Sequence, residues 1–449
     1  MRRERLYSSM LSSRRKQRDQ AAERDGGAAA RQIPPGPERE RIAQLKRKQT
    51  GLERELFKAL RIIDVQKKRG KLPVRSAAIP SCSDVLSSLR TERDVGPTMT
   101  TDRLTPLLAQ RPWLLADGAM GSNLFARGLT SGEAPELWNI EHPQRIRALQ
   151  RSFIEAGADI ILTNSFGGNR HRLKLHKAEG RVAELNEAAA GLARAEADRA
   201  GRVVLVGGSI GPTGEILQPL GPLSGAEARE SFAEQAAALA RGGADILWIE
   251  TMSSAEETEA AIEGARLAAL PVVTTLSFDT NGRTMMGITP AELAGLARKH
   301  HLAACGSNCG VGAAELVASI VNLAAAADPS AILVAKANCG IPQFVDGAIR
   351  FNGTPAVMAE YARLALDAGA RIIGGCCGTT PEHLRAMRQA LETHVRGPKP
   401  SIETIEARLG VLSAGATAQL CGDMDRQAGA APGASKRRPS RRSSTRGES

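Results

Sequence analysis

The sequence predicts an α/β protein built on a (β/α)₈ TIM barrel, with disordered or loosely packed basic extensions at both ends. Between residues 104 and 395, short apolar runs alternate with Ala-rich amphipathic segments. This alternation is typical of a parallel sheet that is covered by helices. Eight such units occur, which suits a closed barrel better than an open sheet. Polar and thiol side chains gather directly after the apolar runs, where such barrels carry their active sites.

The eight apolar runs are the predicted strands. They span residues 113–118, 159–165, 202–211, 245–251, 271–278, 303–309, 331–338 and 371–377. The segments that follow them predict helices, because their apolar residues recur with helical spacing. Several of these segments begin with Ser or Thr before Pro or an acidic residue and end at Gly, as helix caps prefer. These elements predict a barrel domain over residues 99–397.

The net charge of +12 is unevenly placed. Residues 1–98 hold 24 Lys and Arg against 12 Asp and Glu, whereas residues 99–449 hold 36 of each. We therefore expect residues 1–98 to be a basic extension of low order; one interpretation is that Met99 is the biological start. A chain that begins at Met99 should keep its activity, and loss of activity would contradict this. Residues 398–449 lose periodicity and end in Ser and Arg, which predicts a disordered tail.

The composition favours a cytoplasmic protein. The chain has no run of 18 apolar residues, so we expect no membrane span. The segment near its start lacks the apolar core of a secretory signal peptide. Seven cysteines form an odd set, and five of them lie between residues 305 and 377. Metal-binding or catalytic thiols in a reducing compartment explain this better than a disulfide framework. The chain is compatible with a homo-oligomer. The alternative of another class is a nucleic-acid-binding protein whose basic ends bind nucleic acid in a salt-sensitive manner.

Three cysteines predict a metal centre. Cys309 ends the sixth predicted strand, and Cys376 and Cys377 end the eighth, between glycines. Adjacent strand residues point to opposite faces, so the pair can serve one site only if the backbone leaves the strand there. Both strand ends lie on one rim of a closed barrel, and three thiols with a fourth position open describe a catalytic zinc site. The alternative is that they are small buried apolar residues, as we expect for Cys305 within the sixth strand.

Six stretches resemble the homocysteine S-methyltransferase family, which includes betaine–homocysteine methyltransferase and the homocysteine-binding module of cobalamin-dependent methionine synthase. They are "LLADGAMGSNL" (114–124), "AGADIILTNSFGGNRHRL" (156–173), "GSIGPTGE" (208–215), "GADILWIETM" (243–252), "SNCGVG" (307–312) and "GGCCGTTPEHL" (374–384). The resemblance covers about residues 104–395 and neither basic end. It implies a zinc-containing (β/α)₈ barrel, in agreement with the strand pattern.

The resemblance also implies roles for single residues. The family's zinc ligands correspond to the three cysteines named above. Asp117 and Glu250 correspond to the carboxylates that anchor the ammonium group of homocysteine, and backbone amides near Gly118 and Ser165 would bind its carboxylate. Cys339 departs from the family pattern, and we expect it to lie near the site without binding the metal.

The reaction that the resemblance implies is methyl transfer to the homocysteine thiol, which gives methionine. Zinc would deprotonate this thiol, whose pKa is otherwise ~8.5, so the transfer step needs no general base. We expect a small onium donor, with betaine as the first choice and dimethylglycine as its product. Trp138 and Phe166 are the predicted donor contacts because aromatic faces bind quaternary ammonium groups; helix packing is the alternative for Trp138. S-methylmethionine, S-adenosylmethionine and a separate methylcobalamin protein are the alternative donors.

Overall fold

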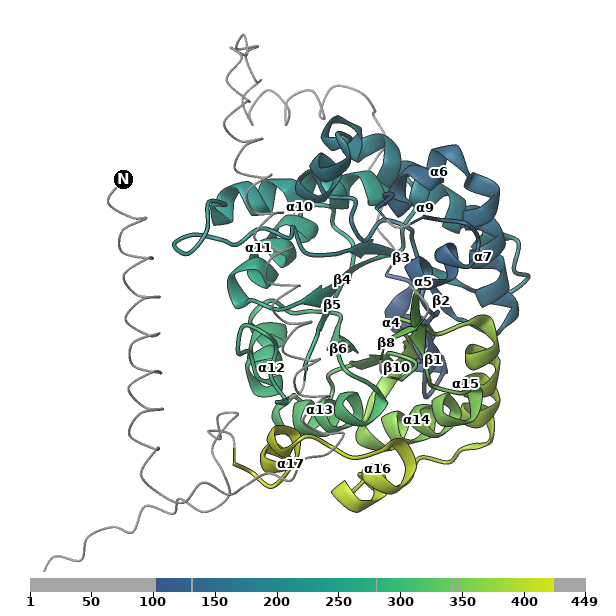
Figure 1. Ribbon diagram of the computed structural model, residues 1–449, viewed down its shortest axis with the longest axis vertical. Coiled ribbons are helices and arrows are strands. Elements are labelled where there is room, and N and C mark those ends of the chain that lie inside the picture. The colour runs from purple at the N-terminus through teal and green to yellow at the C-terminus, as the bar shows by residue number, and fades with distance from the viewer. Residues whose placement is uncertain (1–101, 131, 280, 341, 346–347, 424–449) are drawn as a thin grey trace, which may run out of the picture. The chain divides into compact units, whose positions relative to one another are not determined.

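The computed structural model describes residues 102–423, except residues 131, 280, 341, 346 and 347. Eight parallel strands form a barrel with helices around it (Figure 1). They are β1 (Leu114–Leu115), β2 (Ile160–Leu162), β3 (Leu205–Ile210), β4 (Ile246–Met252), β5 (Val272–Leu276), β6 (Ala304–Cys309), β7 (Leu333–Ala337) and β10 (Ala370–Gly375). Each overlaps one of the eight predicted strands, so the predicted (β/α)₈ barrel is confirmed.

The pairing of the strands closes the barrel. Their order is β1–β10–β7–β6–β5–β4–β3–β2, and every pair is parallel. A parallel bridge between Ala116 and Ile160 then joins the end of β1 to β2. The carboxyl ends of all eight strands therefore meet at one rim.

Helices cover the outside of the barrel. The longer ones are α7 (Pro143–Glu155), α9 (Val182–Asp198), α10 (Gly225–Arg241), α11 (Ala255–Arg266), α12 (Pro290–Lys299), α13 (Ala313–Ala326), α14 (Pro355–Ala368) and α15 (Pro381–Thr393). Shorter elements are α5 (Met120–Phe125), η2 (Pro135–Leu137), α6 (Trp138–Glu141), α8 (Arg170–Leu173), η3 (Lys174–His176) and η4 (Glu179–Arg181). The predicted cap chemistry is present, since Ser224 and Thr289 each form a capping box with a glutamate three residues later.

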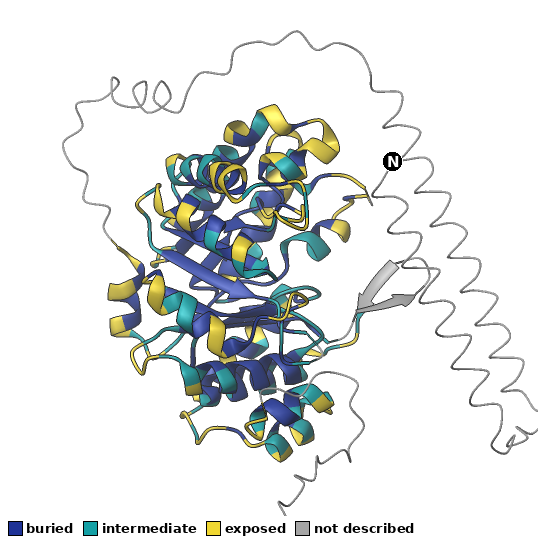
Figure 2. Cartoon of the chain, turned by 90° about the vertical axis from the view of Figure 1, so that its left-hand side faces the viewer, coloured by how far each residue is buried: buried dark blue, intermediate teal, exposed yellow. Residues whose placement is uncertain are grey.

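Buried apolar side chains form two clusters, an inner and an outer layer. The strands consist mostly of buried residues, whereas the helices carry exposed residues on their outer sides (Figure 2). The outer layer lies between the strands and the helices. The inner layer fills the barrel, where Leu114, Ile160 and Trp248 belong to the same cluster as Leu104 and Leu107 of α4 (Leu104–Gln110). Because α4 packs against this interior near the strand starts, the carboxyl ends of the strands are the part of the barrel available for a site.

One hairpin is absent from the sequence prediction. Antiparallel strands β8 (Pro342–Val345) and β9 (Ala348–Phe351) are inserted between β7 and α14. The sequence does carry a signal, because an Asp-Gly pair separates two short runs that contain β-forming residues. The hairpin forms a separate sheet, so the barrel keeps eight strands.

The predicted disorder after residue 398 is wrong for part of that segment. Two helices lie there, α16 (Ile402–Leu409) and α17 (Ala414–Leu420). Ile405 is fully buried in the same apolar cluster as the barrel helices. The Ser413 amide donates to Glu315 Oε1 of α13 at 2.5 Å. Each helix has two turns or so, too few for a helical period to stand out in the sequence.

The predicted extension at residues 1–98 and the tail after residue 423 lie outside the described residues. Among the helices that are described, none has the length and apolar character needed to cross a membrane.

Replacing Ile405 by Ala should lower the free energy of unfolding by about 2–5 kcal/mol, because it removes a fully buried side chain and leaves a cavity. Val411→Ala, at a side chain that is 86% exposed between α16 and α17, should change it by less than ~0.5 kcal/mol. Urea unfolding of both variants measures the difference. Equal stability of Ile405→Ala and the parent would show that α16 does not support the barrel.

Candidate active site

Three thiols meet at the rim of the barrel. Cys309 is the last residue of β6, and Cys376 and Cys377 directly follow β10. Their sulfur atoms all lie within 4.8 Å of one another, and no other group of three potential Cys, His, Asp or Glu ligands occurs among the described residues. A tetrahedral zinc ion with Zn–S distances of about 2.3 Å holds sulfurs about 3.8 Å apart. Small side-chain movements would therefore fit these thiols to zinc.

The backbone after β10 explains how two adjacent cysteines face one point. The Cys376 amide donates to Ala337 O at the end of β7 (2.7 Å), and the Thr379 amide donates to Cys376 O (3.1 Å). Gly378 has a φ of 79°, and a Cβ at Gly375 would overlap the Thr379 side chain. The chain therefore turns out of the strand between two glycines, as the sequence predicted.

Two asparagine side chains orient the thiols. Asn338 Oδ1 accepts from the Cys377 amide at 3.0 Å, and Asn338 Nδ2 donates to Cys309 Sγ at 3.6 Å. Asn308 Nδ2 donates to Cys376 Sγ at 3.8 Å. Donors that point at sulfur stabilise its thiolate form and fix the direction of its lone pairs.

The three thiols hold their protons unequally. Hydrogen bonds from Cys376 and Cys377 lower the pKa of Cys309 to about 3. The hydrogen bond to Cys309 raises the pKa of Cys376 to about 11, and contacts with both other sulfurs raise the pKa of Cys377. One thiolate is thus held by two thiols. A divalent metal would displace the remaining protons, since thiolates are its ligands.

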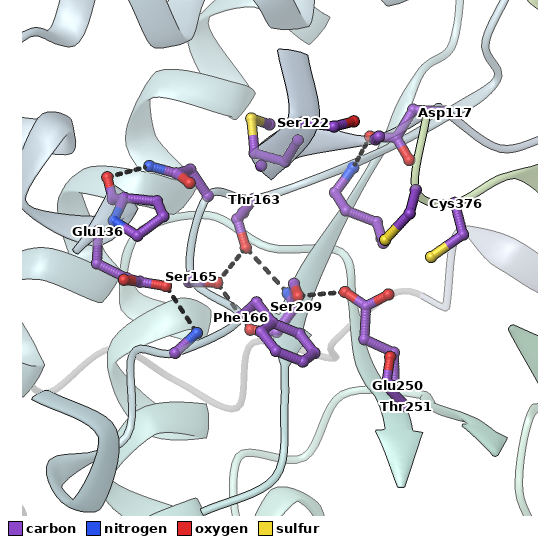
Figure 3. A pocket seen from close by; sticks show the side chains of 18 of the residues that line it. Asp117, Ser122, Glu136, Thr163, Ser165, Phe166, Ser209, Glu250, Thr251 and Cys376 are labelled. Carbon is purple, nitrogen blue, oxygen red and sulfur yellow. Dashed lines mark hydrogen bonds between the residues drawn. The ribbon is translucent and has the colours of Figure 1, made fainter. Parts of the chain in front are cut away.

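The two predicted carboxylates share their surroundings with a lysine. Lys336 Nζ donates to Asp117 Oδ1 at 2.7 Å, and both side chains are almost fully buried (Figure 3). The Leu162 amide donates to the second Asp117 oxygen at 2.7 Å. Glu250 Oε1 accepts from Ser209 Oγ at 2.5 Å, and Glu250 has no ion pair among the described residues. Asp117 thus has a cationic partner within the fold, and its contact with the homocysteine ammonium stays a prediction.

Burial dominates the titration of this group. It raises the pKa of Glu250 to about 7, although the charge of Lys336 acts in the opposite direction. Burial likewise raises the pKa of Asp117, against the effect of Lys336. Burial favours the neutral form of Lys336, but the charges of Asp117 and Glu250 outweigh it and raise the Lys336 pKa. Lys336 is therefore a permanent cation, and Glu250 gains its charge near neutral pH.

A chain of hydroxyl groups connects Glu250 to the end of β2 (Figure 3). Ser209 Oγ donates to Glu250, and the Ser209 amide donates to Thr163 Oγ1 at 2.9 Å. Thr163 Oγ1 lies 2.5 Å from Ser165 Oγ, which donates to Ser209 O at 2.7 Å. These bonds fix the position of the Glu250 carboxylate within the cavity.

The two backbone amides predicted to bind a carboxylate differ. The Ser165 amide donates to Thr163 O at 3.0 Å, so it is engaged within the fold. The Gly118 amide has no hydrogen-bond partner in the part of the chain that the structure describes. A Cβ at Gly118 would lie 2.7 Å from Thr379 O, so the close approach of these two segments requires glycine. Gly118 is therefore the amide donor that remains available.

One cavity of about 350 Å³ contains the groups described so far. Its volume is within the range of sites that hold small molecules. Its lining includes Asp117, Gly118, Ser165, Phe166, Ser209, Glu250, Cys309, Lys336, Cys376 and Cys377. The structure thus brings nearly all predicted site residues together around one space.

The two aromatic residues predicted at the donor site lie in different places. Phe166 lines the cavity, with 37% of its surface exposed. Trp138 does not line it and is buried in the apolar core. The ring of His142 lies 4.7 Å from that of Trp138, and the guanidinium of Arg145 lies 4.9 Å from its centre. The structure therefore gives Trp138 the packing role and does not support its predicted contact with a donor.

Two further cysteines are not part of the three-thiol cluster, although the Cys339 amide donates to Cys377 O at 2.9 Å and so lies near the site. Cys305 is in the core of β6, where burial raises its pKa to about 12. Cys339 Sγ lies 3.1 Å from His383 Nε2, and burial raises the Cys339 pKa to about 11. Both side chains are protonated at neutral pH.

Lys336 is the residue that the sequence analysis missed. It is the one charged residue within the apolar run 331–338, which was itself assigned to a strand. Lysine is almost never fully buried without a partner. A lysine inside a predicted barrel strand therefore indicates a buried carboxylate nearby, although the sequence does not say which one.

Comparison with known proteins gives a consistent picture. The family model described as "Homocysteine S-methyltransferase" matches residues 114–391, more than half of the chain. The chain is 30% identical over 316 residues to a protein named "Methionine synthase" from Mycobacterium tuberculosis, covering 67% of this chain and 26% of that protein. A "Methionine synthase" from Mycobacterium leprae is 30% identical over 307 residues, covering 64% and 25%. The chain thus spans about a quarter of the length of these relatives.

Solved structures agree with the fold. The chain is similar to the homocysteine methyltransferase MmuM from Escherichia coli in its metallated form, with 26% identity and a TM-score of 0.54. This match covers 64% of the present chain and 99% of that one. The oxidized form of the same protein matches with 27% identity and a TM-score of 0.54.

Glu250→Gln should stabilise the protein at pH 8 but not at pH 4. A carboxyl whose pKa rises from 4.5 to about 7 on folding costs stability progressively between these values, and the full cost applies above pH 7. Removing the charge should therefore raise the free energy of unfolding by up to about 3 kcal/mol at pH 8. Urea unfolding at both pH values measures this, with Glu230→Gln on the exposed side of α10 as the control. A variant that is less stable than the parent at pH 8 would contradict the buried charge.

Proposed function

The chain belongs to the homocysteine S-methyltransferase family, and from this premise we propose that it transfers a methyl group from a small onium donor to the thiol of homocysteine, giving methionine. The observation that carries the proposal is that one cavity holds both the three-thiol cluster and Glu250, a buried carboxylate that forms no ion pair among the described residues. The first group suits a metal that binds the substrate sulfur, and the second suits the ammonium of the same substrate.

Cys309, Cys376 and Cys377 would hold the zinc ion, because their sulfurs converge and soft thiolates select this metal. Bound zinc would supply a lowered thiol pKa at the fourth position. Asn308 and Asn338 orient the sulfurs, so the cluster is arranged by the fold itself.

The charges of the inner cavity select a substrate with one ammonium group. Lys336 neutralises Asp117, which leaves Glu250 as the buried carboxylate that gains a partner when homocysteine binds. Ser209 fixes one Glu250 oxygen by its hydrogen bond, so the other is available for the ammonium. The free amide of Gly118 is the proposed donor to the substrate carboxylate.

The transfer is a single displacement at the methyl carbon. The homocysteine sulfur supplies an electron pair for the new S–C bond, and the donor heteroatom keeps the pair of the bond that breaks. The donor loses its positive charge in this step. Because the sulfur has already lost its proton, no side chain has to act as a base during the transfer.

The identity of the donor is the finer part of the proposal. The sequence favours betaine, whose quaternary ammonium binds best where several aromatic faces meet. Phe166 is the one Phe, Tyr or Trp side chain that lines the cavity within the described residues. This composition favours a sulfonium donor such as S-methylmethionine over betaine, and competition between the two in a turnover assay distinguishes them.

Cys309→Ala, Cys376→Ala and Cys377→Ala should each lose most of the bound zinc, because three protein ligands are the minimum of a catalytic zinc site. Cys339→Ala and Cys305→Ala should keep the zinc of the parent. Elemental analysis of the purified variants measures the zinc content per chain. Full occupancy in any of the first three would remove that residue from the ligand set.

Glu250→Gln should weaken homocysteine binding strongly while the zinc content stays unchanged. Removing one member of a buried charged contact costs about 2–5 kcal/mol, which is a loss of tens- to thousands-fold in affinity. Calorimetric titration of the zinc-loaded protein measures the affinity, again with Glu230→Gln as the control. If the Gln variant binds homocysteine as tightly as the parent, the ammonium is held by another group.

A further inference from the structure

The end of strand β4 departs from the regular alternation of a strand. From Ile246 to Ile249 the side chains alternate between the inner and the outer apolar layer. Continued alternation would turn Glu250 inward, Thr251 outward and Met252 inward. Glu250 and Thr251 instead both line the cavity (Figure 3), and Met252 lies in the outer layer. One extra residue is therefore inserted into β4 at this point.

The strand register and the backbone show the same bulge. Ile249 pairs with Thr274 of β5, and Met252 pairs with Leu276, so three residue steps on β4 face two on β5. Thr251 has a φ of 62°, which is a left-handed conformation. This conformation is costly for a β-branched residue, and residues in such conformations cluster at functional sites. Bulges next to active sites commonly re-aim a side chain, so contacts that hold Thr251 in this conformation are part of the site.

The Asn308 side chain holds the bulge. Its Oδ1 accepts from the Thr251 amide at 2.8 Å, and its Nδ2 donates to Thr251 Oγ1 at 2.7 Å. Asn308 belongs to β6 and is fully buried, and its amide reaches Thr251 across the end of β5. Asn308 Nδ2 also donates to Cys376 Sγ at 3.8 Å. One side-chain amide therefore contacts both the bulge of β4 and the metal cluster.

The bulge places the carboxylate that the proposed function assigns to the substrate ammonium. Ser209 fixes Glu250 from the side of β3, and the residue after Glu250 is fixed by Asn308 from the side of β6. Homocysteine has a fixed number of bonds between its ammonium and its sulfur. Both ends can bind at once only if Glu250 and the metal cluster keep a matching separation, and small misplacements are costly in such a two-point contact.

We propose that Asn308 is a positioning residue that couples the ammonium anchor to the metal cluster. It holds Thr251 in the left-handed conformation, which keeps Glu250 directed into the cavity at a set separation from Cys376. The inference rests on the proposed function, because it takes homocysteine as the molecule that joins the two ends. Without Asn308, the segment would relax toward a regular strand, and Glu250 would lose its alignment while the three thiols stay in place.

Two ligands test this role in the zinc-loaded protein. They are homocysteine and 4-mercaptobutyrate, which keeps the thiol, the chain length and the carboxylate but lacks the ammonium. Asn308→Ala should weaken homocysteine binding about tenfold or more and 4-mercaptobutyrate binding less than about threefold, because only the first ligand uses Glu250. Calorimetric titration measures both affinities, and the zinc content should equal that of the parent. Asn322→Ala, on α13 and outside the cavity lining, is the matched control and should equal the parent.

A rescue variant separates positioning from a general structural role. Glycine adopts a positive φ without strain, so Thr251→Gly alone should keep the homocysteine affinity of the parent within about threefold. Added to Asn308→Ala, the same change should recover about threefold or more of the lost affinity, because the bulge then forms without support from Asn308.

Three results would overturn the inference. They are an unchanged homocysteine affinity in Asn308→Ala, an equal loss of affinity for both ligands, and a double variant that binds homocysteine no better than Asn308→Ala. Each of them leaves the proposed function standing, since the parent still binds homocysteine. A parent that binds no homocysteine at all would refute the proposed function, and the coupling role of Asn308 with it.

Discussion

The buried ion pair between Asp117 and Lys336 is the contact on which the rest of the site depends. It joins the end of β1 to β7, and the second Asp117 oxygen accepts from Leu162 of β2. One carboxylate therefore connects three strands at the point where the barrel closes. Strand β1 contributes only two residues to the sheet, so these side-chain bonds support a short ladder. Loss of either partner would leave an uncompensated buried charge. The geometry of the rim therefore depends on this ion pair.

The charge of the cavity follows from the same pair. With Asp117 neutralised internally, Glu250 is the buried carboxylate at the inner end of the cavity that forms no ion pair among the described residues. A buried charge without a partner lowers the stability of the free protein. A cationic ligand that binds the folded state recovers this free energy, because it pairs with the buried charge. The free protein is thus less stable, and its affinity for the ligand is higher, as is common at functional sites.

The sequence predicts the parts of this site that depend on local patterns. Eight apolar runs define the strands, and the glycines around Cys376 and Cys377 indicate the turn that aims both sulfurs at Cys309. The partner of Lys336 is 219 residues away from it, and only the closed barrel brings the two together. For Trp138 the sequence left a donor contact and helix packing as alternatives, because composition does not reveal which side of a loop faces the core. Ser165 shows a third limit, since its amide is taken by a neighbouring carbonyl that no motif reveals.

Two cationic groups have to share one cavity in the proposed reaction, the ammonium of homocysteine and the onium centre of the donor. At a distance on the order of 7 Å and an effective dielectric constant of about 20, two positive charges repel each other by about 2 kcal/mol. Glu250 beside the ammonium offsets part of this repulsion under the proposed assignment. After the transfer the onium charge is gone, while the ammonium of the new methionine remains. The repulsion between the two ligands therefore ends with the transfer, so the step that forms methionine also relieves it.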